Sequence, residues 1–189
     1  KHVRRASTTA GRSGPPARAL VAIVFLALLR PASAFQPSSK AELQTAVDEW
    51  CAGTSPGSYG GEHISNWDTV LITDMQGLFN GKSTFNDDIG SWSTASVTNM
   101  MYTFREATAF NQPLGSWNTA AVSDSMYGTF WEASAFDQDL SAWDIQSVPD
   151  MRNMFKRASS FDRYLCWEIP DGVDTEGMFE ESPGSADCP

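Results

Sequence analysis

The stretch WSTASVTNMMYTFREATAFNQPLGSW (residues 92–117) contains the unit from which most of the chain is built. It begins and ends with tryptophan, and two phenylalanines, Phe104 and Phe110, stand six residues apart between them. Tryptophans recur at positions 67, 92, 117, 143 and 167, a spacing of 24 to 26 residues. A fixed period of about 20 to 50 residues is the signature of a repeat array. We therefore expect a solenoid of about five stacked coils.

Apolar residues also recur at fixed places inside each unit. Met100, Phe104 and Ala107 have the i, i+4, i+7 spacing of one helix face, and Thr98 precedes them as a candidate N-cap. The following pattern Phe-(Asn/Asp)-x-x-Leu-x-x-Trp is typical of an extended segment. Each coil is therefore predicted to contain a short helix and a strand, which makes the fold class an α/β repeat solenoid.

The ends of such an array need lids, because a terminal coil has no neighbour to cover its apolar side. Residues 39–50 have the pattern of an amphipathic helix, with Leu43, Val47 and Trp50 on one face. We interpret this segment as an N-terminal capping helix. The predicted organisation is a signal peptide (1–34), an N-terminal cap (35–63), a repeat solenoid (64–182) and a C-terminal tail (183–189) closed by a disulfide.

The repeat resembles a known family. Trp-Asn-Thr-Ala-Ala-Val (117–122), Val-Thr-Asn-Met-Met-Tyr-Thr-Phe (97–104) and Ala-Phe-Asn-Gln-Pro-Leu (109–114) are similar to the repeat of the BspA-type leucine-rich-repeat surface proteins, over residues 64–179. The resemblance implies an exported, leucine-rich-repeat-like α/β solenoid, in some members adhesive, and it supplies no catalytic residues. The chain departs from the repeat at Lys82 and Thr175, in its terminal units, and at Ser125, an inserted residue that predicts a local bulge.

The first 34 residues have the features of a signal peptide. They hold six basic residues and no acidic one, and the apolar run ALVAIVFLALL (19–29) is too short to cross a bilayer. Ala32 and Ala34 predict cleavage before Phe35; an uncleaved anchor is the alternative. We expect secretion or attachment to the cell surface. Because residues 32–37 resemble the junction of bipartite plastid presequences, plastid import is the alternative compartment.

Charge excludes some partners. Residues 35–189 contain 7 basic and 23 acidic residues, a formal charge of −16. Such a body repels phosphate backbones and anionic lipids, so nucleic acid is not an expected partner. No second segment is predicted to span a membrane after signal cleavage, and the sequence leaves the oligomeric state open.

Three cysteines remain after the predicted cleavage site. Cys166 lies in the last full unit and Cys188 lies 22 residues further on, which predicts a disulfide between them and an oxidising compartment. Cys51 belongs to the opposite end of the array, beyond the reach of a disulfide to either one. It is expected to be unpaired, either buried under the cap or available for an intermolecular bond.

Trp131 is the first candidate binding residue. Its column in the repeat otherwise holds polar or charged residues, namely Asn80, Arg105, Lys156 and Glu180. Tyr102 and Tyr127 belong to neighbouring turns, so the three aromatic residues predict a patch for an extracellular protein or carbohydrate. The competing interpretation is that Trp131 folds over the edge of an irregular coil.

Carboxylates after the second phenylalanine of each unit form a second candidate site. Asp87, Asp88, Asp137 and Asp139 recur at equivalent positions in an Asn/Asp ladder. Such side chains commonly satisfy backbone groups of turns. The alternative is calcium binding by an acidic matrix component, since Ca²⁺ takes carboxylate oxygens.

Catalysis is not expected. Residues 53–57 match the nucleophile pattern G-x-S-x-G, but Pro56, which follows Ser55, has no N–H to donate to an oxyanion. His63 is the one histidine after the predicted cleavage site. We therefore expect a noncatalytic protein without a cofactor, calcium being the possible exception.

Overall fold

The computed structural model describes residues 34–188. The predicted signal peptide, apart from Ala34, lies outside the described residues. Helix α1 (Lys40–Cys51) comes first, and Ser39 is its N-cap because its Oγ accepts the N–H of Glu42. A single 3₁₀ turn, η1 (Ile64–Asn66), follows. The described residues contain no helix long and apolar enough to span a membrane.

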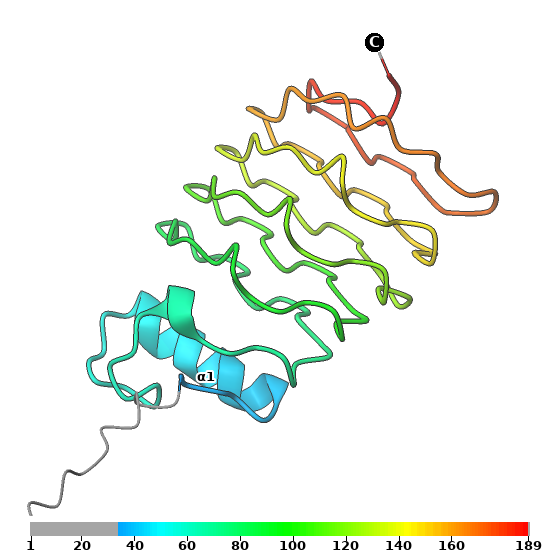
Figure 1. Ribbon diagram of the computed structural model, residues 1–189. Coiled ribbons are helices and arrows are strands. Elements are labelled where there is room, and N and C mark those ends of the chain that lie inside the picture. Colours follow the sequence, from blue (N-terminus) through cyan, green and yellow to red (C-terminus); the bar gives the residue numbers. More distant parts are fainter. Residues whose placement is uncertain (1–33, 189) are drawn as a thin grey trace, which may run out of the picture. The chain divides into compact units, whose positions relative to one another are not determined.

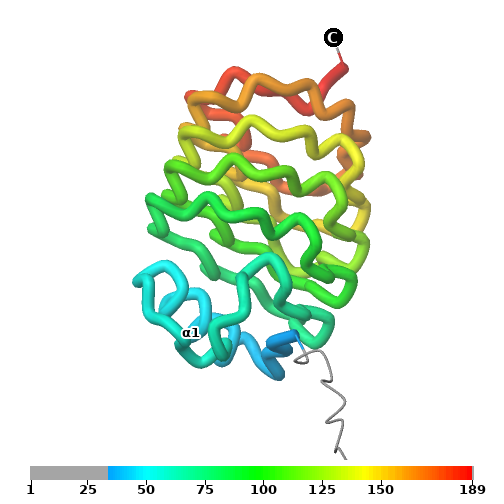
Figure 2. Tube along the Cα trace, turned by 60° about the vertical axis from the view of Figure 1, so that its left-hand side comes forward, coloured from blue at the N-terminus to red at the C-terminus, as the bar shows by residue number. Residues whose placement is uncertain are grey.

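From Trp67 onward the chain winds in successive coils that lie on one another (Figures 1 and 2). The N–H groups of Met100, Tyr102, Phe104 and Glu106 donate to carbonyl oxygens of the next coil at 2.8–2.9 Å. The same four-bond pattern joins each pair of neighbouring coils along one side of the stack. We call this side the turn strip; it comprises residues 74–81, 99–106, 125–132, 150–157 and 174–181.

The short helix predicted in each coil is wrong. In the described residues, helix occurs only in α1 and η1. Residues 100–107 instead form consecutive four-residue turns, in which Thr103 N–H bonds to Met100 O and Ala107 N–H to Phe104 O. Tyr102 and Glu106, the third residues of these turns, have φ of 57°, as in type II turns. A positive φ at every fourth residue is incompatible with an α-helix.

The segment between the second phenylalanine and the next tryptophan of each unit is predicted to be a strand, and it does not form one. Among the described residues, the one bridge in such a segment joins Tyr164 to Ser185. The other isolated parallel bridges, such as Asp74 with Asn99 and Asp150 with Asp174, lie at the start of the turn strip, and no strand of two or more bridged residues occurs. Thr98, the candidate N-cap, instead donates its N–H to Thr73 O in the preceding coil. Neighbouring coils are therefore joined by a parallel backbone ladder, with turns in place of the regular elements expected.

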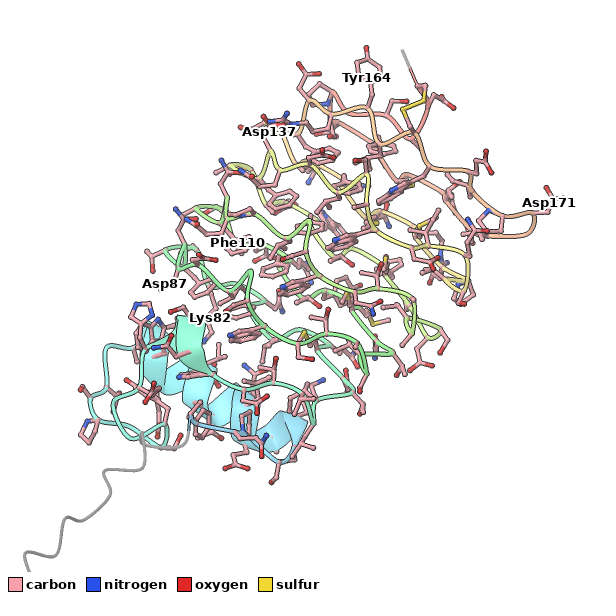
Figure 3. The ribbon with its side chains drawn as sticks, viewed as in Figure 1. Lys82, Asp87, Phe110, Asp137, Tyr164 and Asp171 are labelled. Carbon is pink, nitrogen blue, oxygen red and sulfur yellow. A yellow bond between two sulfur atoms is a disulfide. The ribbon has the colours of Figure 1, made fainter. Side chains whose placement is uncertain are left out.

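The interior consists of aromatic columns that run along the stack. The first phenylalanines of successive units stack nearly parallel, with ring centroids 5.2–5.4 Å apart. Phe110, labelled in Figure 3, belongs to the second column and stacks 5.6 Å from Phe85. The periodic tryptophans Trp92, Trp117, Trp143 and Trp167 each donate Nε1–H to a carbonyl of the preceding coil, namely that of Ile64, Ile89, Leu114 and Leu140, respectively. These bonds satisfy the one polar group of each of these four indoles inside an apolar core.

Helix α1 closes the first coil. Its residues Leu43, Ala46 and Val47 are buried, and Gln44 donates its Nε2 to Leu78 O at 3.1 Å. Lys82, one of the departures from the repeat, pairs with Asp48 of α1 at 2.6 Å. Its place beside α1 is visible in Figure 3. The departure at Lys82 therefore belongs to the contact between the repeat and its lid.

The C-terminal tail closes part of the last coil. Cys166 and Cys188 form the predicted disulfide, with Cα atoms 4.6 Å apart. Leu165 N–H and Trp167 N–H donate to Ser185 O and Ala186 O, both at 2.9 Å. The tail thus continues the backbone ladder on the tryptophan side.

The predicted bulge at Ser125 is misplaced. Ser125 forms a bridge with Asn99, and its Oγ accepts Tyr127 N–H, as Asn99 Oδ1 accepts Met101 N–H in the coil before. The extra residue falls earlier, where Ser123 N–H and Asp124 N–H share the carbonyl oxygen of Thr98. The irregularity is absorbed before the turn strip begins, so the aromatic columns keep their register.

Candidate binding surface

Trp131, Tyr102 and Tyr127 lie together on the turn strip. The two tyrosine rings meet edge to face at 5.1 Å, and each lies 6.3 Å from the Trp131 ring. All three side chains are half-buried. We call this group the aromatic cluster.

Gly128 makes the close packing of Tyr102 possible. Its φ is +57°, and a Cβ at this position would stand 2.8 Å from the Tyr102 ring. Asn153 fixes the other tyrosine, because its Nδ2 donates to Tyr127 Oη at 3.1 Å. Burial is the main cause that raises the pKa of Tyr102 above its ordinary value. The phenol is therefore neutral and available as a hydrogen-bond donor at physiological pH.

Cations from the coils on either side flank the aromatic cluster. The Arg105 guanidinium lies 4.9 Å from the Trp131 ring centroid and 5.3 Å from that of Tyr102. Lys156 Nζ lies 5.6 Å from Trp131, and Arg152 lies 5.3 Å from Tyr127. These are cation–π distances. Trp131 is thus neither fully exposed nor folded over a distorted coil; it occupies its column between two basic side chains.

Two polar atoms of this surface lack partners. Trp131 Nε1 and Arg105 Nε are buried and have no hydrogen-bond partner among the described residues. An unsatisfied buried donor costs about 1–3 kcal/mol. The basic side chains beside Trp131 are long and flexible, so a ligand acceptor could reach its Nε1 after a rotamer change.

Asp150 anchors the cation nearest to Tyr127. Arg152 bonds to it through Nε and Nη2, both at 3.0 Å, and also lies 3.4 Å from Asp174. The side-chain hydrogen bond from Arg152 is the largest cause that lowers the pKa of Asp150 below its ordinary value. The pair orients Arg152 beside Tyr127.

This lowered pKa predicts a pH dependence. A carboxylate with a depressed folded-state pKa stabilises the fold above its unfolded pKa, about 3.9, and loses that contribution as pH falls through the folded value. We expect Asp150→Asn to be less stable than wild type at neutral pH and to lose less stability as the pH falls below about 5. Denaturant titrations across that window measure it. The exposed Asp171→Asn is the control; equal slopes for both variants would contradict the prediction.

The carboxylates proposed for calcium have protein partners. Asp87 accepts Trp50 Nε1–H at 2.9 Å, and Asp137 pairs with Arg163 at 2.7 Å. Asp88 and Asp139 each accept a backbone N–H two residues ahead at 2.9 Å. Figure 3 shows Asp87 and Asp137 at the same edge of different coils. The described residues contain no group of three His, Cys, Asp or Glu side chains that could hold a metal ion.

Side chains of this edge form a ladder between coils. Asn86 Oδ1 accepts Asn111 N–H, Asn111 Oδ1 accepts Asp137 N–H, and Asp137 Oδ1 accepts Asp162 N–H, at 2.8–3.2 Å. These bonds satisfy backbone donors of the turns, which is the structural role weighed against calcium.

We expect millimolar calcium to leave the melting temperature unchanged. The carboxylates that calcium would need are already paired, so binding would have to break bonds that stabilise the fold. Differential scanning calorimetry with calcium and with EDTA measures the effect, and magnesium serves as the control ion. A rise of several degrees specific to calcium would instead support the calcium alternative.

Sequence reasoning did not identify several exposed apolar side chains. Val70 is 45% exposed, Leu71 is 52% exposed and Tyr164 is 57% exposed. Their columns hold small or polar residues in other units, so a comparison by column could have found them, as it found Trp131. Cys51 is free and half-buried, and its burial raises the pKa of the thiol. It is a poor nucleophile in this state.

Comparison with protein families gives one result. The family described as "Mycoplasma protein of unknown function, DUF285" matches residues 45–167 and again residues 124–184. The chain belongs to this family. The DUF285 match covers the turn strip and both aromatic columns, and its two overlapping ranges agree with internal repetition. No curated protein and no solved structure matches the chain.

DUF285 is a repeat family without a known function. A functional hypothesis must therefore come from the surface of this chain. The disulfide is compatible with an extracellular protein.

Proposed function

We propose that this DUF285 protein is a noncatalytic binding module, secreted or held at the cell surface, that engages an extracellular protein or carbohydrate through the aromatic cluster. The observation that carries the proposal is the convergence of Tyr102, Tyr127 and Trp131 on one face, with the Trp131 Nε1–H left without an acceptor among the described residues. Aromatic side chains with a polar handle are typical of recognition surfaces.

The cluster offers both kinds of contact that such a partner needs. The tyrosine hydroxyls and the indole N–H supply hydrogen bonds, and the rings supply apolar area. Displacement of Arg105 or Lys156 from Trp131 would expose a ring face, and a ligand hydroxyl or carbonyl could then accept from Nε1. Arg105 is ion-paired with the adjacent Glu106 at 2.6 Å.

The proposal that the protein is exported and noncatalytic is supported by features outside the aromatic cluster. A signal-like N-terminus, a disulfide and the resemblance to BspA-type repeats support an exported, leucine-rich-repeat-like solenoid, and the alternative of plastid import uses the same N-terminal features. A noncatalytic role is supported by the environment of the two candidate catalytic residues: His63 Nδ1 contacts Ser65 Oγ at 2.8 Å, and Ser55 is exposed and followed by proline.

Trp131→Ala tests the proposal. Residues 35–189 are applied to arrays of glycans and of extracellular proteins, and each positive partner is measured by titration. We expect the substitution to weaken binding by about tenfold or more, as for a central aromatic contact. The control is Tyr164→Ala, which removes the most exposed aromatic side chain of another surface.

Equal binding by wild type and Trp131→Ala would contradict the assignment of this site, provided that both melt at similar temperatures. Loss of binding with Tyr164→Ala alone would move the site to the other surface. If no glycan and no protein on the arrays gives a signal, the proposed binding function is contradicted.

A further inference from the structure

Among residues 34–188, no further coil pairs with the last segment of the turn strip. In every earlier segment, four alternate N–H groups donate to carbonyls of the next coil. The equivalent donors in residues 174–181 are the N–H groups of Thr175, Gly177, Phe179 and Glu181, and they have no acceptor among residues 34–188. This end of the stack therefore presents a row of donors at the register that a further strip of chain would use.

The C-terminal tail leaves this row open. Its backbone bonds to the last coil lie at Arg163, Leu165 and Trp167, and none reaches residues 174–181. Between the tail and the last strip lies a hollow of about 420 Å³, lined by Ile169, Met178, Phe179, Ser185 and Ala186 among others. Phe179, the last ring of its column at 5.2 Å from Phe155, is only half-buried. An added strip would find apolar contacts here as well as donors.

The charge of the last coil indicates what kind of added strip it would bind. Residues 164–189 contain seven acidic residues and no basic one. At the preceding junction, Lys156 pairs with Glu180 at 2.8 Å and Arg157 with Glu181 at 3.1 Å. Glu176 has no ion pair among the described residues. The outer side of the last coil is thus acidic where the coil before it is basic.

A second copy of the chain does not fit this end in the same way. The matching surface would be the outer side of the first coil, and α1 occupies it. Gln44 already bonds to Leu78 O at 3.1 Å, and Lys40 pairs with Asp74 at 3.1 Å. The acceptor edge of a second molecule is therefore covered.

We propose that the open edge of residues 174–181 binds an extended basic peptide segment of a partner protein, which adds one parallel strip to the stack. Alternate carbonyls of the peptide accept the four free N–H groups, an apolar side chain enters the hollow beside Phe179, and basic side chains meet Glu176 and the acidic surface around it. This is recognition by backbone augmentation, with the side chains selecting the sequence. It uses a surface separate from the aromatic cluster.

The probe is a synthetic peptide with the sequence of residues 149–158, PDMRNMFKRA. In the structure the carbonyls of its Asp150, Arg152, Met154 and Lys156 accept four N–H groups of the preceding strip. The same register on the open edge would bring its basic side chains to the acidic ones. The matched control peptide is VDTEGMFEES, residues 173–182, which has similar backbone geometry and the opposite charge.

Binding is measured by fluorescence anisotropy with the chain from residue 35, and the site by hydrogen exchange. We expect the basic peptide to bind at least about tenfold more tightly than the acidic one. We also expect slower exchange at the amides of Gly177, Phe179 and Glu181 when the basic peptide is saturating. The tail-facing amides of Leu165 and Trp167, which are already bonded, should not change.

Two variants with the same change in net charge separate the edge from the general acidity. Glu176→Lys lies on the open edge, whereas Glu168→Lys lies on the tryptophan side of the same coil. We expect Glu176→Lys to weaken binding by about fivefold or more and Glu168→Lys to change it by less than about twofold.

The proposal is overturned by equal affinity for the two peptides, by equal effects of the two variants, or by protection that develops outside residues 174–181. Absence of any binding at millimolar peptide would also overturn it, and would show that the acidic edge serves only to keep strands away. Failure of the Trp131 experiment would leave this result unaffected, since the two surfaces share no residue.

Discussion

Replacement of Phe130 by alanine is expected to lower the free energy of unfolding by about 3–5 kcal/mol. Phe130 is fully buried and lies in the middle of its column. Its ring stacks on Phe104 and Phe155, both at 5.4 Å, and on Phe136 at 4.1 Å. Because the coils on both sides are held by backbone hydrogen bonds, the neighbours cannot close the cavity. Chemical denaturation monitored by tryptophan fluorescence measures the loss.

Phe179→Ala is the matched control, because it removes the same side chain from the end of the same column. Phe179 is half-buried and has a neighbouring coil on one side only, so its loss should cost clearly less than that of Phe130. Equal costs at the two positions would contradict the column as the source of the stability.

Removal of the disulfide should have the second largest effect. In the chain-entropy description, a loop of this size contributes about 3 kcal/mol. The sequence separation is 22 residues. We expect Cys166→Ser with Cys188→Ser to release the tail, whose backbone hydrogen bonds to the last coil lie at Arg163, Leu165 and Trp167. In a stack, a loss at one end is felt mainly by the adjacent coil. The readout is hydrogen exchange at Leu165 and Trp167, whose amides bond to the tail.

The control for the disulfide variant is Cys51→Ser, which removes a free thiol at the opposite end. It should leave exchange at Leu165 and Trp167 unchanged. Retained protection of these two amides in the double variant would show that the tail docks without its covalent link.

The aromatic columns were predictable from the sequence, and the local backbone conformation was not. The same apolar residue returns about every 25 residues, and this spacing alone places the indoles and benzyl rings in register. The error concerned Met100, Phe104 and Ala107. In the structure residues 100, 103, 104 and 107 are buried and the residues between them are not. Consecutive four-residue turns thus bury the same positions as an amphipathic helix, and periodicity cannot separate the two.

A second signal could have corrected the error. The third residues of the turns include Gly77, Gly81, Gly128 and Gly177, all with positive φ. Glycine at these places disfavours a helix and favours turns. In residues 92–117, which show the repeat most clearly, a tyrosine and a glutamate stand at the equivalent positions and conceal the pattern.

The candidate surface was predictable in part, because the repeat period also aligns its residues. Columns place Tyr102, Tyr127 and Trp131 on neighbouring turns, which is where they lie. The cations over their rings were not foreseen, because a column fixes a backbone position and not the direction of a long side chain. The open edge of the last coil was missed as well, since unpaired N–H groups leave no trace in side-chain patterns.

The backbone ladder of the turn strip has one direction throughout: each coil donates to the next and accepts from the one before. Every interior coil therefore offers one donating face and one accepting face, whereas the capping contacts occur only at the first and last coils. Duplication of an internal segment of one period would lengthen the molecule by about 4.8 Å and leave both termini unaltered. The length of the stack can thus change by whole coils while the capping structures at both ends stay the same.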